Sequence, residues 1–410
     1  MSPEDRVAPG GGVAAEGSGS AAGAVAAPGR VPVREDLAEV SPYGAPQLDV
    51  AVRLNTNETA EPPPPGYLEE VGRRIQGLEL NRYPDRPATA LRDALARRLG
   101  TTRDHVWAAN GSNEILQQLL QAYGGPQRQA LTVRPGYSMY PELCRTSLTP
   151  VAEVDLDDGF LLTPGIAAQA VARHDPDVIL VPSPNNPVGT PVGHDALRVL
   201  HDASRALLVV DEAYIEFAAA EQSAWELLAE LPRLVLVRTL SKAFRLAGLR
   251  LGYLVGPSWV VEDVQKVRLP YHLDAIKQVA GIVAVEQEAA FLEHRRRIAE
   301  ERDRVAAALR ALADADRPDD AEGSADDGEV DADGGDEVVR SIEVFPSVAN
   351  FLLVRSRVPA LFDRLLEHGV LVRDFSTRPG LEGCVRVTIG TREENDAFLR
   401  ALDRVLAAEQ

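Results

Sequence analysis

The chain has 410 residues, of which 45% are hydrophobic and 26% are charged, and its formal net charge is −19. Single hydrophobic cores stop growing at roughly 250–300 residues, so a chain of this length predicts more than one lobe. No stretch approaches the ~18 consecutive apolar residues of a membrane-spanning helix, and residues 1–30 lack a secretory signal pattern. The only cysteines, Cys144 and Cys384, exclude a disulfide framework and a cysteine-rich zinc site. These features predict a cytoplasmic protein.

Most of the negative charge lies in one segment. Residues 314–337 carry twelve acidic residues and a single arginine. Like charges repel and no aromatic residue anchors this segment, so we predict a disordered acidic insert. Its order of acids does not match a calcium-binding EF-hand loop, and we expect no metal. Residues 1–30, which are mainly Gly, Ala, Ser and Pro, predict a disordered tail. The chain has no basic stripe, so we expect no nucleic-acid partner.

The N-terminal half alternates helical and strand patterns. Apolar residues at helical spacing predict helices over 89–99 and 112–123, with Thr89 and Ser112 as N-caps, on either side of a short strand at 106–110. Continuous apolar runs are typical of strands buried on both faces of a parallel sheet. Such runs occupy 177–184, 206–214 and 233–240. The alternation predicts an α/β sheet with helices on both sides.

After Pro270 the pattern changes. A long Arg- and Glu-rich helix, roughly 281–311, leads into strands near 349–354, 370–374 and 384–389 mixed with helices. We therefore predict a second, smaller α+β domain. The predicted organisation is a tail (1–30), an N-terminal arm with part of the small domain (31–75), a large domain (76–290) and a C-terminal small domain (291–410).

Lys242 is the most informative candidate for chemistry. The chain has 43 basic residues but only three lysines, and Lys242 follows an apolar strand directly after Ser241. Ligands bind at the carboxyl ends of parallel strands. An arginine stays protonated, whereas a shielded lysine can lose its proton and form a Schiff base with a carbonyl. A surface lysine is the alternative interpretation.

Further polar residues follow the neighbouring strands. Asp211 could keep a pyridinium nitrogen protonated, and Tyr214 with Asn186 could hydrogen-bond a ring hydroxylate. The start of the 112–123 helix offers backbone N–H groups to a phosphate, and an arginine eight residues after Lys242 could join them. Alternatives are a helix-capping role for Asp211 and a core position for the aromatic Tyr137. The phosphate candidates are Ser112, Asn113, Ser241 and Arg250, with Thr239 left open.

These motifs resemble the fold-type-I pyridoxal-phosphate aminotransferases, class II, and more narrowly the histidinol-phosphate aminotransferase family, over roughly residues 31–405. The resemblance implies an α/β fold with a large, mostly parallel-sheet domain and a smaller α+β domain. The motifs are Ser41-Pro42-Tyr43, Leu54-Asn55-Thr56-Asn57-Glu58, Arg82-Tyr83-Pro84-Asp85, Asn185-Asn186-Pro187-Val188-Gly189, Asp211-Glu212-Ala213-Tyr214, Thr239-Leu240-Ser241-Lys242-Ala243-Phe244 and Ala247-Gly248-Leu249-Arg250. Two departures are Val188, where the family has Thr or Ser, and Thr59-Ala60, where it has Asn-Pro.

The resemblance also implies the cofactor, pyridoxal 5'-phosphate, and the role of each residue. Lys242 would hold the cofactor and move the proton, with Asp211 on the ring nitrogen and Tyr137 stacked on the ring. Tyr83 would reach the cofactor phosphate of a second subunit, which implies a homodimer. The substrates implied are L-histidinol phosphate and 2-oxoglutarate, and the products imidazole acetol phosphate and L-glutamate, in histidine biosynthesis.

Substrate anions would be read by two arginines of the second lobe. Arg373 and Arg386 match the family positions that meet the acidic end of the substrate, and Tyr43 and Asn57 would line the same end. A guanidinium fork suits a phosphate and a carboxylate equally. An ion pair between Arg373 and Asp374 is the alternative, and His272 either packs in a loop or faces the site. Other functions left open are an aromatic aminotransferase, a phospho-amino-acid decarboxylase and a non-catalytic interaction protein.

Overall fold

The computed structural model describes residues 31–38, 40–42, 44–315 and 342–408. The predicted tail, Tyr43 and nearly all of the predicted acidic insert lie outside these ranges. The chain divides into two units, residues 1–43 and 44–410. In the first, the described residues form one short 3-10 helix, η1 (Glu35–Leu37), with an ion pair of 2.8 Å between Arg34 and Asp36. All remaining elements belong to the second unit.

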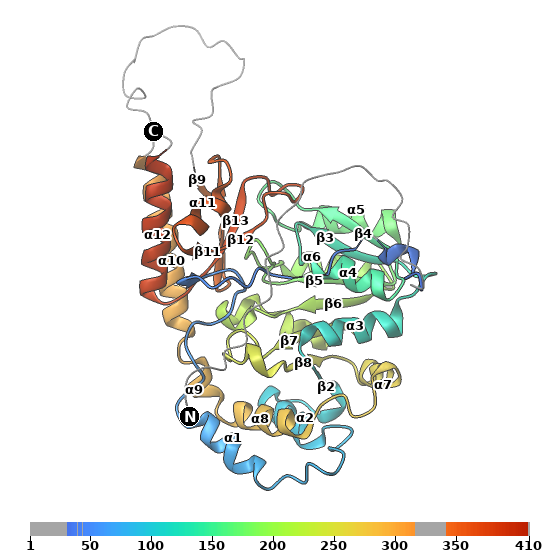
Figure 1. The fold of residues 1–410 in the computed structure, drawn as a ribbon. Helices are drawn as coiled ribbons and strands as arrows, with labels where there is room; N and C mark the ends of the chain where they lie inside the picture. The colour runs from blue at the N-terminus through green and yellow to red at the C-terminus, as the bar shows by residue number, and fades with distance from the viewer. Residues whose placement is uncertain (1–30, 39, 43, 316–341, 409–410) are drawn as a thin grey trace. The chain divides into compact units, whose positions relative to one another are not determined.

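A seven-stranded sheet forms the centre of the second unit (Figure 1). Its order is β2-β8-β7-β6-β5-β3-β4, and β8 alone runs antiparallel to its neighbours. Every residue of β5, β6 and β7 is buried, as the continuous apolar runs predict. The strands are β2 (Val106–Ala109), β3 (Ala130–Arg134), β4 (Val151–Asp155), β5 (Val178–Pro182), β6 (Leu207–Asp211), β7 (Leu234–Thr239) and β8 (Gly252–Val255).

Helices cover both faces of this sheet, because successive strand residues point to opposite sides. Leu207 and Val209 pack with α3 (Ser112–Tyr123), α4 (Met139–Thr146) and α7 (Ser258–Val267). Leu208 and Val210 pack with α5 (Pro164–His174) and α6 (His194–Asp202) on the other side. The β2–β8 end packs against α2 (Thr89–Leu99) and α8 (Ala275–Glu286). This arrangement is the α/β architecture that the sequence predicts.

The C-terminal part adds two smaller sheets. The first is antiparallel with the order β12-β13-β10-β9, formed by Arg373–Asp374, Cys384–Thr388, Phe351–Ser356 and Ile342–Val344. In the second, β1 (Val52–Arg53) pairs in parallel with β11 (Val370–Leu371). The helices of this part are α9 (Glu288–Leu292), α10 (Arg295–Ala315), α11 (Leu361–Glu367) and α12 (Arg392–Ala407), whereas α1 (Tyr67–Ile75) packs against α8. Short 3-10 helices complete the unit: η2 (Arg103–His105), η3 (Ile215–Phe217), η4 (Ala220–Gln222), η5 (Ala224–Ala229) and η6 (Ala247–Leu249).

Three details of the sequence prediction are wrong. The single helix over 281–311 is three helices, α8, α9 and α10. The predicted strand over 370–374 is divided between two sheets, with β11 in one and β12 in the other. Thr89 and Ser112 are first helical residues rather than N-caps, since Ala88 and Gly111 precede α2 and α3 with φ of 50° and 83°. Among the described residues, no helix has the length and apolar character needed to cross a bilayer.

Candidate active site

The carboxyl ends of β5, β6 and β7 bring the main candidate residues to one edge of the sheet. Asp211 is the last residue of β6, Asn186 follows β5, and Lys242 follows β7. The register of the parallel strands sets Pro182 beside Asp211, and Asp211 beside Val237. Residues separated by as many as 56 positions in sequence therefore share one site because the sheet is parallel.

Segment 56–59 forms hydrogen bonds with both the side chain and the backbone of Lys242. The Lys242 Nζ donates a hydrogen bond to the Thr56 carbonyl at 2.9 Å, and the Thr59 hydroxyl donates to the Lys242 carbonyl at 2.9 Å. Burial, helped by the positive charges of Arg386 and Arg250, lowers the pKa of Lys242 to about 7. A substantial fraction of this amine is therefore neutral at neutral pH, as a nucleophile or a general base requires. Thr59 is one of the two departures from the family motif, and its hydroxyl now supports the lysine backbone.

Asp211 is buried, with one hydrogen-bond donor to each carboxylate oxygen. The Ala213 N–H donates to Oδ1 at 3.1 Å, and the Tyr140 hydroxyl donates to Oδ2 at 3.3 Å. Burial raises the pKa of Asp211 to about 7, partly opposed by these two donors. Sequence reasoning missed Tyr140, which lies 71 positions from Asp211 and looks like an ordinary core residue of α4.

Tyr214 lies between two amide side chains. Its hydroxyl accepts hydrogen bonds from Asn57 Nδ2 at 3.1 Å and from Asn186 Nδ2 at 3.4 Å. Lys242 Nζ is 5.6 Å from the centre of the Tyr214 ring. The sequence pairs Tyr214 with Asn186, and the structure adds Asn57 to this pair. Asn57 has a positive φ of 54°, a conformation that is costly for a residue other than glycine and that concentrates at functional sites.

The predicted phosphate candidates converge where α3 begins. A Cβ added to Gly111 would lie 3.0 Å from Arg250 Nη2, so the guanidinium rests against the backbone that opens α3. Arg250 Nη1 donates to the Ser241 hydroxyl at 3.2 Å, and the Thr239 hydroxyl donates to the same oxygen at 2.9 Å. A helix N-terminus with a guanidinium and a hydroxyl beside it suits a phosphate dianion. Thr239 thus supports Ser241 directly.

Tyr137 and Asn113 lie beside each other near this cluster. The Tyr137 hydroxyl donates to Asn113 Oδ1 at 3.2 Å, and the Tyr137 ring meets the Tyr140 ring edge-on, with 5.3 Å between the centroids. Tyr137 therefore links the start of α3 to the tyrosine that contacts Asp211. Its position agrees with an aromatic wall of the site.

The two arginines predicted to read substrate anions lie directly opposite each other. Arg373 of β12 and Arg386 of β13 are register partners in an antiparallel pair. Arg386 is buried, and it donates to Asn186 Oδ1 at 2.5 Å and to the Asn55 carbonyl at 2.8 Å. Arg373 is partly accessible and donates to the Gly44 carbonyl at 3.4 Å.

Two other candidates lie apart from this cluster. Tyr83 is 79% exposed and stacks on Tyr271, with 4.3 Å between the ring centroids. His272 stacks on Trp107 at 5.2 Å, and its Nε2 lies 3.0 Å from the Ala108 carbonyl, which agrees with a packed loop histidine. Tyr43 lies outside the described residues.

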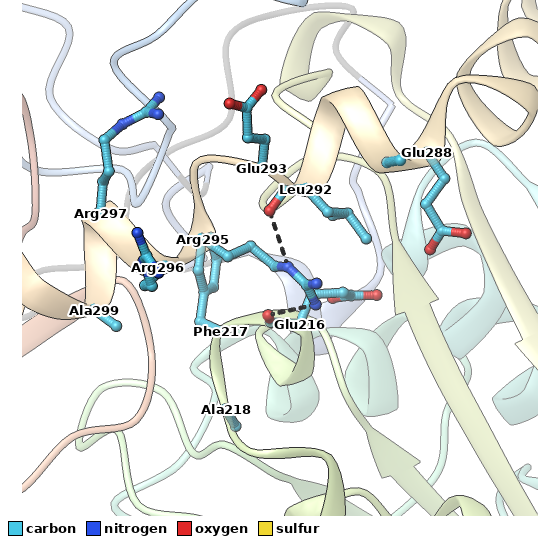
Figure 2. A pocket seen from close by; sticks show the side chains of 11 residues that line it. Glu216, Phe217, Ala218, Glu288, Leu292, Glu293, Arg295, Arg296, Arg297 and Ala299 are labelled. Atoms are coloured by element: carbon cyan, nitrogen blue, oxygen red, sulfur yellow. Dashed lines mark hydrogen bonds between the residues drawn. The ribbon is translucent and has the colours of Figure 1, made fainter.

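A separate hollow of about 980 Å³ lies between η3 and the start of α10 (Figure 2). Arg295 crosses it, donating to the carbonyls of Leu292 and Glu216 at 3.1 and 3.3 Å. The walls mix three arginines with three glutamates, and none of the predicted site residues lines it. The hollow is therefore distinct from the predicted strand-end site.

The strand-end cluster fits the cofactor that the sequence resemblance implies. It contains an amine of lowered pKa, a buried carboxylate and an aromatic wall. It also contains a helix N-terminus at which a glycine lets a guanidinium approach the backbone. Pyridoxal phosphate needs a partner for its aldehyde, its ring nitrogen, its ring face and its phosphate, and this set provides one of each. Within the described part of the chain, no cluster of three or more His, Cys, Asp or Glu side chains could hold a metal ion.

Comparison with known proteins agrees with this geometry. Residues 49–402 match the family model for aminotransferase class I and II. Histidinol-phosphate aminotransferase from Mycobacterium marinum is 43% identical, over 92% of this chain and 94% of that protein. The Nocardia farcinica enzyme of the same name is also 43% identical, over 93% of each chain. The fold matches histidinol-phosphate aminotransferase from Sinorhizobium meliloti, solved in complex with pyridoxal-5'-phosphate, with a TM-score of 0.74, 24% identity and coverage of 88% and 92%. The chain therefore belongs to the class I and II aminotransferase family and, within it, to the histidinol-phosphate aminotransferases.

Proposed function

We propose that this protein is a pyridoxal-phosphate-dependent transaminase of histidine biosynthesis. It converts L-histidinol phosphate and 2-oxoglutarate into imidazole acetol phosphate and L-glutamate. The observation that carries the proposal is that Lys242 Nζ lies 5.6 Å from the centre of the Tyr214 ring, while Asn186 hydrogen-bonds to both Tyr214 and the buried Arg386. Each amino donor and acceptor of this reaction combines a reacting carbon with an anionic end, so such a site needs both groups together.

The geometry of the strand ends supports the cofactor contacts that the sequence resemblance implies. Lys242 is the attachment point, and Asp211 pairs with the ring nitrogen. Tyr214 and Asn186 contact the ring oxygen, and Tyr137 covers one ring face. The phosphate is held by the start of α3 with Ser112, Asn113, Ser241 and Arg250.

The chemistry divides between cofactor and protein. Bound pyridoxal phosphate carries the amino group and withdraws electrons from the substrate α-carbon. Lys242 Nζ would take up the substrate α-proton and release it again, because its pKa of about 7 lets the amine act as base and as acid. The Thr56 carbonyl, 2.9 Å from Nζ, is a ready acceptor for the amine when it is free.

Arg373 and Arg386 select the substrates through their anionic ends. In this proposal the two arginines, which are register partners on β12 and β13, bind the phosphate of histidinol phosphate in one half-reaction and a carboxylate of 2-oxoglutarate or glutamate in the other. Asn57 contributes to this end of the site through its contact with Tyr214. Tyr43 remains a proposed member of this group on the resemblance alone.

The active unit in this proposal is a homodimer. Tyr83 is 79% exposed and stacks on Tyr271, as expected of a residue that serves another subunit's cofactor phosphate. Leu80 and Leu269, near Tyr83 and Tyr271 in sequence, are 62% and 73% exposed. Contiguous apolar patches mark interfaces, and in this proposal Leu80 and Leu269 contribute to one. A cytoplasmic location completes the proposal, since histidine synthesis uses soluble cytoplasmic metabolites.

The direct test is transamination by the purified protein loaded with pyridoxal phosphate. Glutamate formation from histidinol phosphate and 2-oxoglutarate is expected, and phenylalanine is expected to be a much poorer amino donor. Lys242→Ala should reduce turnover by about a hundredfold or more, because the proton carrier is lost. Lys266→Ala is the matched control, since Lys266 is exposed and pairs with Asp263 at 2.5 Å on α7. Equal rates with phenylalanine, or near-native turnover by Lys242→Ala, would contradict the proposal.

A further inference from the structure

Tyr140 is a buried tyrosine whose hydroxyl reaches the site from the helix layer formed by α3, α4 and α7. It lies on α4, is 0% exposed, and packs in the apolar cluster formed by α3, α4, α7 and one face of the sheet. Burying a hydroxyl without a partner is costly, and a phenylalanine would fill the same space without that cost. The hydroxyl is explained by its hydrogen bond of 3.3 Å to Asp211 Oδ2.

Strand alternation explains why the two side chains meet. Along β6, Leu207 and Val209 face the α3–α4–α7 layer, so the next residue in this alternation, Asp211, faces the same layer. The Asp211 side chain therefore points toward Tyr140. Because Asp211 is also the last residue of β6, it lies at the active-site edge of the sheet. The backbone N–H of Ala213 donates a hydrogen bond to the other carboxylate oxygen at 3.1 Å. Two donors from different elements, one per oxygen, fix the plane of the carboxylate.

We propose that Tyr140 is a positioning residue of the active site, which holds the Asp211 carboxylate in one orientation and favours its charged form. The proposal rests on the proposed function, because Asp211 matters to catalysis as the partner of the cofactor ring nitrogen. Tyr140 acts through Asp211 and is not itself a catalytic residue. Nothing in the family motifs of the sequence marks it.

The electrostatic surroundings of Asp211 agree with this role. Burial raises the pKa of Asp211 to about 7, and the nearby charge of Glu212 acts in the same direction. The hydrogen bonds from Ala213 and Tyr140 act in the opposite direction. Burial and the neighbouring Asp211, Tyr137 and Tyr214 raise the pKa of Tyr140 well above 10, so the phenol keeps its proton as a donor. Glu212 itself is turned to Arg238, with an ion pair of 2.7 Å.

Tyr140→Phe tests the proposal through cofactor affinity as a function of pH. Removing the donor raises the pKa of Asp211 further, so more of the carboxyl is neutral at pH 7 and pairs less well with a ring nitrogen. We expect the Kd for pyridoxal phosphate, measured by tryptophan fluorescence on the cofactor-free protein, to rise about tenfold at pH 7, in line with the loss of a hydrogen bond to a charged group. The ratio of variant to wild-type Kd should shrink toward pH 9, where Asp211 is ionised in both proteins.

Tyr123→Phe is the matched control. Its hydroxyl also donates to a carboxylate, Asp263 Oδ2 at 2.8 Å, but that pair joins α3 to α7 away from the strand-end cluster. This variant should lose a similar hydrogen bond and keep the wild-type Kd at every pH. Thermal unfolding of the two cofactor-free variants gives the structural cost of each lost hydroxyl separately.

A double-mutant cycle with Asp211→Asn shows whether Tyr140 acts through Asp211. With the carboxylate charge already absent, Tyr140→Phe should add little further loss of cofactor affinity. An unchanged Kd in Tyr140→Phe, a loss independent of pH, or an equal loss in the Asp211→Asn background would each overturn the proposal. Wild-type protein that does not bind pyridoxal phosphate would instead contradict the proposed function, and this outcome is visible before any variant is compared.

Discussion

At the residue scale, the lowered pKa of Lys242 sets the pH range in which the protein can act. Two physical causes contribute: burial first, and then the positive charges of Arg386 and Arg250. Below the pKa the amine is protonated and unreactive, and above it the amine is neutral. The reactive form therefore appears near pH 7 rather than near 10.5, the ordinary pKa of a lysine side chain.

Competitive acetylation of the cofactor-free protein measures this difference directly. Labelling of Lys242, followed by mass spectrometry, should reach its midpoint near pH 7. Lys266 is an internal reference, because its ion pair with Asp263 raises its pKa and delays its labelling to more alkaline pH. Arg386→Met removes one positive charge and should move the Lys242 midpoint upward. A common midpoint for both lysines would show that the site does not perturb Lys242.

At the element scale, a buried ion pair ties the end of β6 to β7. Glu212 is 0% exposed and pairs with Arg238 of β7 at 2.7 Å, and it also accepts from the Ser223 hydroxyl at 2.9 Å and the Ala224 N–H at 2.7 Å. These contacts hold the segment that carries Asp211 and Tyr214. The pair thus stabilises the segment that carries the site residues, and it has no proposed contact with the substrates.

Glu212→Gln should lower the free energy of unfolding by roughly 3–5 kcal/mol, because it removes the carboxylate that forms an ion pair with the buried Arg238 guanidinium. Urea unfolding of the cofactor-free protein measures the change. Glu230→Gln is the control, since Glu230 pairs with Arg198 at the surface at 2.8 Å and its removal should change the stability very little. Equal effects of the two substitutions would mean that burial does not distinguish these ion pairs.

The strands and helices also show how much of the fold the sequence patterns predict. β5, β6 and β7 are readable because strands buried on both faces have to be continuously apolar. The short, glycine-initiated β8 and its antiparallel direction are not readable, because they depend on pairing between distant segments. The helix breaks at Gln287 and before Arg295 carry no Gly or Pro, so periodicity alone joins α8, α9 and α10. At the site, sequence motifs identify Lys242, Asp211 and Arg250. Tyr140 can be identified only from the structure, because its contact with Asp211 depends on the packing of α4 against β6.

At the scale of the whole molecule, exposed apolar residues around Tyr83 predict an interface between two copies. Leu269→Glu places a charge there and should shift the protein toward monomer at low micromolar concentration, with activity falling in parallel because Tyr83 would no longer reach a partner. Light scattering coupled to size-exclusion chromatography measures the assembly. Leu161→Glu is the control, since Leu161 is also exposed, at 46%, but lies between β4 and α5. A fully active monomer would contradict the dimer proposal.

The opposed arginines of β12 and β13 also affect how the enzyme should be handled. Arg373 and Arg386 are register partners on neighbouring strands, and two positive charges in one binding region attract small multivalent anions as well as substrates. Phosphate or sulfate in a purification buffer would then compete with both substrates and lower the apparent rates. Assays in chloride-only zwitterionic buffers, with graded additions of sulfate, would separate this inhibition from the intrinsic kinetics.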